Sequence, residues 1–271
     1  MATLGPHGPL PQPSVAEEDP PLADQHAHAY QPQLSVGDRR AGLFGALYRV
    51  CGCHPWMMRP LACALWGVDV SPLYRTIRLI GSLQGVCVAD VPCGSGVALR
   101  ALASGPDVRY LALDADAGAL RRAERHARRR SLTQIRFQRG DLTALPFADG
   151  EIDVFLCFGG LHLADDLDRA LTEIARCLTP GGLLVGTSFF SDLAPRGRHL
   201  FELGARRGHP LPPSREQMYK SMYASGLVEG TLGPDYGFAS FRARKSPDGR
   251  GPARTSRRAK ARSPRRQRGR P

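Results

Sequence analysis

The sequence predicts an α/β fold built on a mostly parallel sheet. Between residues 86 and 243, short apolar segments of strand length alternate with segments in which apolar residues recur at helical spacing. The first such segment, Val86–Val91, leads into a turn with Gly94 and Gly96, and a helix is expected after it. A strand, a glycine turn and a helix N-terminus let the backbone approach a nucleotide-like ligand closely. These observations predict a doubly wound sheet with helices on both faces.

The expected strands are short β-branched or apolar runs bounded by turn-forming residues. They are Val86–Val91, Val108–Leu113, Ile135–Arg139, Ile152–Phe158, Leu183–Ser188, Leu227–Leu232 and Phe238–Arg242. The expected helices are Val97–Ala103, Ala117–Arg130, Leu167–Leu178 and Ser214–Ser225. A short helix, Gly197–Arg206, is expected inside the long connection Phe189–Pro213, which is either a lid or substrate wall or a variable surface loop.

The glycine turn departs from two common nucleotide-binding motifs. Leu99 stands where a dinucleotide fingerprint needs its third glycine, and no lysine follows to make a phosphate-cradling loop. The distinctive residue is Asp90, just before the turn. A second acid, Asp114, ends the second strand 24 residues later, where a carboxylate can accept hydrogen bonds from ribose hydroxyls. Asp116 is an alternative, although it fits better as the N-cap of the next helix.

Three segments resemble a known family. Asp90–Gly96, which reads D-V-P-C-G-S-G, resembles the first motif of class I S-adenosylmethionine-dependent methyltransferases, with Pro92 in place of the first glycine. Gly140–Val154 resembles a motif of small-molecule methyltransferases of the ubiquinone/menaquinone-biosynthesis type, also called type 11. Pro180–Val185 matches the family's turn and fifth strand. The resemblance covers residues 66–190 well and 214–241 loosely, and it implies a Rossmann-like sheet of seven strands, parallel except for the last.

The resemblance implies S-adenosylmethionine as the cofactor. In that family the acid corresponding to Asp141 contacts the adenine amino group, and the backbone at Leu142 frames the ring. The expected cofactor-binding residues are Asp90, Pro92, Gly94, Gly96, Asp114, Ala115, Asp141, Leu142 and Cys157.

Methyl transfer is an in-line displacement that depends mainly on positioning the acceptor. His162, just after the fourth strand, is the candidate catalytic base, although it can equally cap or pack the loop. Amino-directed methyltransferases carry an [Asn/Asp]-Pro-Pro-[Tyr/Phe] element where this chain has Cys157–Gly160. We therefore expect transfer to an oxygen or carbon of a small apolar or aromatic molecule. Residues that either line its pocket or belong to the core are Trp56, Trp66, Phe158 and Phe189.

Four segments are expected along the chain. Residues 1–38 are a disordered Pro-rich tail, 39–85 a helical cap interrupted at Pro55 and Pro60, 86–243 the methyltransferase domain, and 244–271 a disordered basic tail. Residues 242–271 hold 13 of the 37 Lys and Arg residues and one acid, which accounts for the whole net charge of +12. This tail leaves open an RNA-associated methyltransferase or a non-catalytic binding protein of the same fold, although it has no aromatic residues for base stacking.

Composition limits the compartment and the metal content. The chain has no run of 18 apolar residues, so no membrane span is expected. Residues 1–38 contain no Lys or Arg and no apolar segment, so they are not expected to act as a secretory signal. Its seven cysteines, an odd number, favour free thiols and a cytoplasmic location. No metal site is expected, because Cys51, Cys53, His54 and Cys63 do not have the spacing of a common zinc motif. The oligomeric state cannot be predicted from the sequence.

Overall fold

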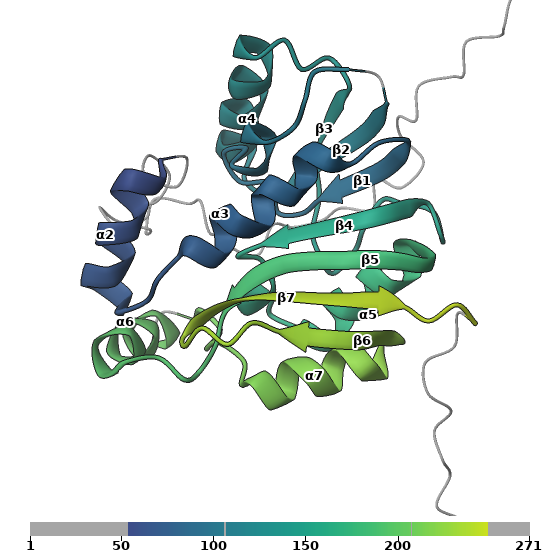
Figure 1. Ribbon diagram of the computed structural model, residues 1–271. Coiled ribbons are helices and arrows are strands. Elements are labelled where there is room, and N and C mark those ends of the chain that lie inside the picture. The colour runs from purple at the N-terminus through teal and green to yellow at the C-terminus, as the bar shows by residue number, and fades with distance from the viewer. Residues whose placement is uncertain (1–53, 106, 207, 249–271) are drawn as a thin grey trace, which may run out of the picture. The chain divides into compact units, whose positions relative to one another are not determined.

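The computed structural model describes residues 54–105, 107–206 and 208–248, and it contains the expected sheet of seven strands (Figure 1). The strands lie in the order β3-β2-β1-β4-β5-β7-β6. Strands β1 to β5 pair in parallel, whereas β7 is antiparallel to both of its neighbours. The predicted fold class is confirmed. The strands are β1 (Val86–Asp90), β2 (Val108–Asp114), β3 (Ile135–Arg139), β4 (Ile152–Phe158), β5 (Leu178–Phe189), β6 (Leu227–Leu232) and β7 (Phe238–Lys245).

Successive strand residues face opposite sides of the sheet, and each side has its own buried cluster. Val88 and Tyr110 belong to the cluster shared with α3 (Ser71–Arg78) and α4 (Ala117–Arg129). Ala89 and Phe155 belong to the cluster shared with α5 (Leu167–Cys177) and α7 (Arg215–Ala224). The central strands are therefore buried on both faces, which explains why their sequences are continuously apolar.

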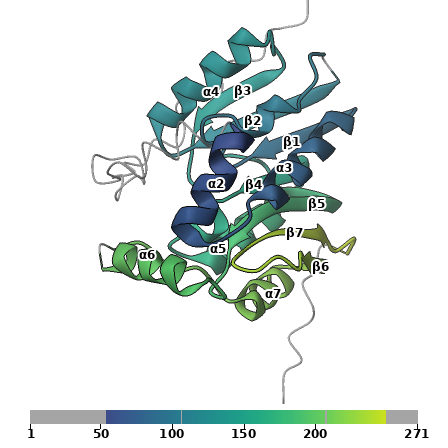
Figure 2. The same cartoon turned by 60° about the vertical axis from the view of Figure 1, so that its left-hand side comes forward.

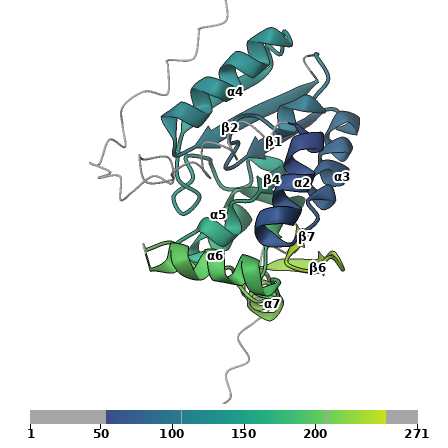
Figure 3. The ribbon, with the colours of Figure 1, turned by 90° about the vertical axis from the view of Figure 1, so that its left-hand side faces the viewer.

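The carboxyl ends of the parallel strands meet at one edge of the sheet, on the left in Figure 1. Helices α2 (Pro55–Trp66) and α6 (Pro195–Ala205) lie at this edge, and Figures 2 and 3 bring them toward the viewer. The Arg196 guanidinium donates a 2.7 Å hydrogen bond to the Cys63 carbonyl and so joins the two helices. Because the strand order reverses between β1 and β4, this edge is where an α/β sheet binds its ligand.

The expected helix over residues 97–103 is wrong, since only the 3-10 turn η2 (Ala98–Arg100) forms. The Arg130 guanidinium donates to the carbonyls of Leu99 and Leu102, and the Gln134 amide donates to that of Ala103. These side chains satisfy the carbonyl groups at the end of the turn, so a longer helix is not needed to pair them.

The amino-terminal helices also differ from expectation. Pro55 begins α2, as a proline at the first helical position should, but Pro60 lies inside the helix and does not end it. Met58 and Ala62 anchor α2 in the core on either side of that proline. Helix α3 lies within the expected helical cap of residues 39–85, although no bounds were predicted for it. Asp69 stabilises its start by accepting from the backbone N–H of Ser71 at 2.9 Å. Both helices share one compact unit with the sheet.

Two expected irregular features of the second half are present. The Pro180–Gly182 turn lies within β5, where the pairing with β4 shifts from Ile152 opposite Leu178 to Val154 opposite Leu183. The long connection after β5 contains α6. Ser214 and Gln217 form a capping box at the start of α7, which matches the helix expected over Ser214–Ser225.

Several sequence-based predictions concern residues outside the described ranges. These are the tail 1–38, the residues 39–53 with Cys51 and Cys53, and most of the basic tail. Within the described ranges, no helix combines the length and apolarity needed to cross a bilayer. The same part of the chain has no cluster of three or more His, Cys, Asp or Glu side chains suited to a metal ion.

The contact between α2 and α6 provides a test of how tightly this end of the sheet is packed. A Cβ on Gly197 would lie 2.4 Å from the Trp66 carbonyl oxygen, whereas one on Gly204, in the same helix, would approach nothing closer than 3.7 Å. We expect Gly197→Ala to lower the free energy of unfolding by about 1–3 kcal/mol. The matched Gly204→Ala should raise it by up to ~1 kcal/mol. Urea denaturation measures both, and equal effects would contradict the packing described.

Candidate cofactor and acceptor site

The glycine turn after β1 is fastened to the tip of β2. The backbone N–H of Gly94 donates to Asp114 Oδ2 at 2.8 Å, and the N–H of Cys93 donates to the Leu113 carbonyl at 2.8 Å. Sequence analysis assigned the glycines and Asp114 to the same site from their spacing, and the structure joins them by a direct hydrogen bond.

The two glycines of the turn are needed for different reasons. Both have positive φ, +55° at Gly94 and +84° at Gly96, a region that other residues rarely adopt. A Cβ on Gly96 would also lie 2.9 Å from Leu99 Cδ1 and 3.3 Å from Ala123 Cα, so Gly96 lets the turn pack against α4. A Cβ on Gly94 would meet no atom within 4 Å. The backbone at Gly94 therefore borders open space that a ligand can approach, which fits a nucleoside cofactor.

Asp114 has the geometry expected of a ribose-binding carboxylate. Its Oδ1 accepts from the Asp116 N–H at 2.8 Å, and the side chain is 8% exposed. Burial raises the pKa of Asp114, while hydrogen bonds from the backbone at Asp116 and Gly94 oppose the rise. Each carboxylate oxygen has two lone pairs and uses one on these N–H groups. The second lone pairs are the acceptors available to hydroxyl groups.

The two residues that follow Asp114 make different contacts. Asp116 is the N-cap of α4, with its Oδ1 accepting from the Gly118 N–H at 2.7 Å, so that expectation is confirmed. The Ala115 carbonyl accepts from Arg139 Nε at 3.0 Å, which ties the residue after β2 to the end of β3.

Asp90 lies beneath the turn and is 1% exposed. Its Oδ2 accepts from the Tyr110 hydroxyl at 2.9 Å, while its Oδ1 has no partner among the described residues. Burial raises the pKa of Asp90 to about 7, the Tyr110 hydrogen bond lowers it, and the Asp114 carboxylate raises it. Sequence analysis missed Tyr110, although a tyrosine in an otherwise aliphatic buried strand signals a hydroxyl that needs a partner.

Pro92 joins the glycine turn to the turn after β4. A Cβ on Gly160 would lie 2.3 Å from Pro92 Cδ and 2.8 Å from Cys157 Sγ, so the proline ring packs directly against this glycine. The Val91–Pro92 peptide is cis. Cys157 itself is completely buried on the α5 side of the sheet, and burial raises its thiol pKa to about 12. This placement gives the Cys157 side chain a packing role.

The segment after β3 is held in place by a residue that sequence analysis overlooked. Asp141 Oδ1 accepts from both the backbone N–H and the hydroxyl of Thr143 at 2.7 Å, which folds the start of this segment into a turn. Leu142 is half-buried against the α5-side core. The Arg176 guanidinium then donates to the carbonyls of Leu145 and Phe147, at 3.1 and 2.8 Å. Arg176 thus positions the segment that carries Asp141 and Leu142.

An aromatic cluster lies at the carboxyl ends of β4 and β5. His162, in η3 (Leu161–Leu163), meets the ring of Phe189 edge-on at 5.0 Å between centroids and that of Phe201 at 6.2 Å. Trp66 packs on Phe189 at 5.7 Å. Phe158 is buried in the same core, whereas Trp56 is 75% exposed and lies apart from the cluster. Phe201 comes from α6, in the connection expected to be a substrate wall or a surface loop.

His162 is neutral in this setting. It is 6% exposed, and burial lowers the pKa of its imidazole to about 3. The Phe189 backbone N–H points at His162 Nδ1 across 3.5 Å, so Nδ1 acts as an acceptor and the neutral ring carries its proton on Nε2. An imidazole with so low a pKa is a weak base at neutral pH.

Comparison with known proteins finds methyltransferases among the similar sequences. Residues 88–182 match the model of a methyltransferase domain family. A demethylmenaquinone methyltransferase of Renibacterium salmoninarum is 39% identical over 148 residues, covering 54% of this chain and 60% of the relative. The corresponding enzyme of Lactococcus lactis is 31% identical over 131 residues, covering 48% of this chain and 52% of the relative. The chain thus spans less than two thirds of either relative.

A solved structure of geranyl diphosphate methyltransferase in complex with SAM has the same fold. It is 15% identical, with a TM-score of 0.53, and the match covers 65% of this chain and 85% of that one. Residues 88–182 thus resemble a methyltransferase domain, and the sheet order and the glycine turn have the arrangement expected of that fold. Over the matched residues, the chain is similar to the two demethylmenaquinone methyltransferases.

The buried Asp90 carboxyl makes stability depend on pH. Its folded pKa of about 7 lies above the ~3.9 of an unfolded aspartate, so the folded state holds the proton more tightly between these values. Stability should therefore fall as the pH rises from 4 to 7, by at most ~1.4 kcal/mol per unit for one proton. Asp90→Asn should flatten this slope. Tyr110→Phe should extend the fall in stability above pH 7, because loss of the hydrogen bond raises the Asp90 pKa further. Denaturant titrations at several pH values measure the slopes, and unchanged slopes in both variants would contradict the assignment.

The His162 imidazole should remain neutral across the range in which an ordinary histidine, with a pKa of about 6.5, becomes protonated. We expect its ring ¹³C and ¹⁵N shifts to stay constant from pH 8 to 5. The signal is assigned by its loss in His162→Asn. Protonation near pH 6.5 would show that the ring is solvated and would restore it as a candidate base.

Proposed function

We propose that this protein is an S-adenosylmethionine-dependent methyltransferase that methylates an oxygen or carbon of a small apolar or aromatic molecule. The hydrogen bond between Gly94 and Asp114 carries the proposal, because it holds the Asp114 carboxylate, which would accept ribose hydroxyls, beside a glycine turn that borders open space. The relatives support the acceptor class, since the Renibacterium and Lactococcus enzymes are both named for demethylmenaquinone, a quinone.

The cofactor-binding roles are divided among three segments. Asp114 would accept the ribose hydroxyls, and Gly94 and Gly96 would give the cofactor close access to the turn. The Asp141 turn would lie against the adenine, with Leu142 framing the ring. Asp90 and Pro92 act through the turn rather than at its surface, because Asp90 is buried beneath it and Pro92 packs on Gly160.

Bound S-adenosylmethionine supplies an electrophilic methyl group on a positively charged sulfur. The protein's own contribution is to orient the acceptor and to exclude water. Phe189, Phe201 and Trp66 form an apolar wall for an apolar or aromatic acceptor. We assign His162 to this wall as a neutral ring, because its low pKa disfavours proton abstraction. As part of the wall, the ring would contact the acceptor without exchanging a proton with it. An acceptor that ionises by itself, or a carbon nucleophile activated by its own hydroxyl group, requires no strong base from the protein.

Free thiols support the proposed compartment. The five described cysteines form no disulfide, and they are Cys63, Cys87, Cys93, Cys157 and Cys177. We propose the cytoplasm, where thiols stay reduced. No described contact favours the nucleic-acid alternative for the methyltransferase site itself.

The first test measures cofactor binding without knowing the acceptor. We expect S-adenosylhomocysteine to bind with a micromolar Kd in calorimetry, and Asp114→Ala to weaken binding at least tenfold, about 1.4 kcal/mol. Asp165→Ala, which removes an exposed carboxylate near the same edge, is the matched control and should leave Kd unchanged.

Two results would count against the proposal. Absence of binding by folded wild-type protein would favour the non-catalytic alternative. Equal losses in both variants would show that Asp114 acts only through general charge. If binding behaves as expected, quinones, phenols and fatty acids are the acceptors to screen.

A further inference from the structure

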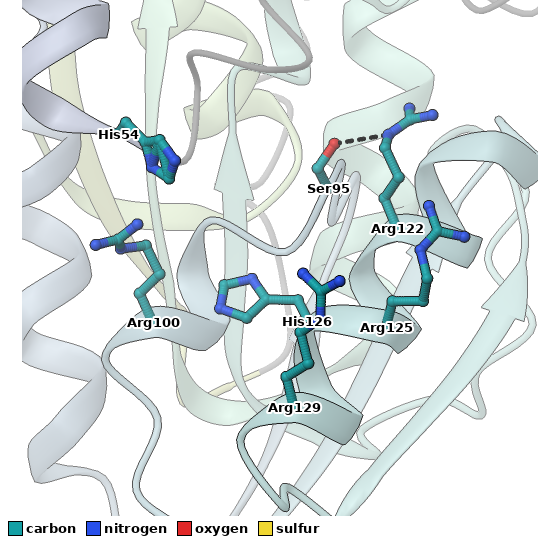
Figure 4. Close-up of a pocket in the computed structure, with 7 residues that line it drawn as sticks. All are labelled: His54, Ser95, Arg100, Arg122, Arg125, His126 and Arg129. Carbon is teal, nitrogen blue, oxygen red and sulfur yellow. Dashed lines mark hydrogen bonds between the residues drawn. The ribbon is translucent and has the colours of Figure 1, made fainter.

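A strongly basic pocket lies on the α4 side of the glycine turn (Figure 4). Its volume is about 310 Å³. The lining residues are His54, Ser95, Arg100, Arg122, Arg125, His126 and Arg129. Four of them come from one face of α4, where spacings of three and four residues bring side chains together. Figure 4 shows Arg100 and His54 on the opposite side of the hollow from the α4 residues.

The charges of this pocket are poorly balanced. Its lining contains four arginines, two histidines and no carboxylate. Asp116 lies 3.5 Å from Arg122, but within the described part of the chain Arg125 and Arg129 have no ion pair. Several cations around one concave surface create a positive potential that attracts anions.

The pKa of His126 is affected by these positive charges. Burial lowers the pKa of its imidazole first, and the charges of Arg130, Arg100 and Arg129 lower it further. A hydrogen bond to the backbone of Ser95 acts in the opposite direction. The groups that act on the His126 ring are thus Arg129 and Arg130 at the end of α4, Arg100 of η2, and the backbone of Ser95 in the glycine turn.

We propose that this pocket binds a small anion carrying phosphate, of the size of a phosphate monoester or a diphosphate. Guanidinium groups present paired N–H donors that match phosphate oxygens, and the pocket volume suits a small polar ligand. S-adenosylmethionine contains no phosphate, and none of the residues that line this pocket is among the expected cofactor-binding residues. The lining has no Phe, Tyr or Trp side chain on which a base could stack, which favours a small anion over single-stranded nucleic acid.

The pocket is also connected to the glycine turn. Arg122 Nε donates to the Ser95 hydroxyl at 3.1 Å, and Ser95 stands between Gly94 and Gly96. A phosphate group held by Arg122 and His126 would therefore be one residue away from the backbone that borders the cofactor space. The proposal does not depend on methyl transfer, because it concerns binding alone.

The test compares two double variants that remove equal charge from the same helix. Inorganic diphosphate is titrated into the full chain by calorimetry at constant ionic strength. Arg125→Gln/Arg129→Gln should weaken binding at least tenfold. The control Arg121→Gln/Arg128→Gln changes exposed arginines that do not line the pocket, and it should weaken binding less than twofold. S-adenosylhomocysteine binding and thermal unfolding confirm that both variants fold.

A second readout separates the pocket from the basic carboxyl-terminal residues, which also attract anions. Bound diphosphate should raise the His126 pKa, because an anion stabilises the protonated imidazole against the arginines around it. NMR titration should show this rise in wild type and in the control, and no rise in Arg125→Gln/Arg129→Gln. A nucleoside diphosphate and phosphatidylglycerol vesicles, titrated in parallel, distinguish a soluble phosphate ligand from a lipid headgroup.

Three results would overturn the proposal. The first is equal diphosphate binding by the pocket variant and the control. The second is a His126 pKa that does not respond to diphosphate. The third is pocket-dependent binding of a single-stranded RNA oligonucleotide without binding of diphosphate, which would identify a nucleic-acid surface instead.

Discussion

The hydrogen bond from the Gly94 N–H to the Asp114 carboxylate is the constraint on which the candidate site depends. It joins the turn after β1 to the tip of β2, so the residues proposed to bind the cofactor from two strands are fixed relative to one another. Asp114 also accepts from the Asp116 N–H, which begins α4. One buried carboxylate therefore sets the position of a turn, a strand end and a helix start. A neutral side chain of similar size would keep the shape but weaken both charge-assisted bonds.

The two acids of the site are kept different by their surroundings. Asp114 is 8% exposed and is held by two backbone donors, which suits a carboxylate that meets hydroxyl groups. Asp90 has one hydroxyl donor and almost no access to solvent, so its proton is held up to about pH 7. Since the Asp114 carboxylate raises the Asp90 pKa, a protonated Asp90 relieves the charge beneath the turn. The two acids thus differ in their proposed roles as well as in how deeply they are buried.

Much of this arrangement was predictable from the sequence because it depends on local patterns. Strand length, glycine positions and the 24-residue spacing of Asp90 and Asp114 all follow from neighbouring residues. The features that were missed depend on contacts between distant segments. Pro92 meets Gly160, Tyr110 reaches Asp90 across adjacent strands, and Arg176 reaches the carbonyl groups before β4.

The local sequence pattern also gave a wrong prediction in two places. Pro60 remains inside α2 because the helix is anchored by buried residues, and the segment after the glycine turn stays short because Arg130 pairs its carbonyls. In both cases a tertiary contact outweighed a local preference that the sequence expresses clearly.

The glycine turn separates two environments of opposite character. On one side, His162 and the rings of Phe189 and Phe201 make a neutral wall, and burial keeps the imidazole uncharged. On the other side, the arginines of α4 and η2 gather positive charge against Ser95. A positively charged methyl donor is compatible with aromatic rings, whose faces attract cations, and would be repelled by a protonated histidine or by arginines. Confining the cations to the α4 side would therefore let the same short turn border both the proposed cationic cofactor and the proposed anion-binding pocket without electrostatic conflict.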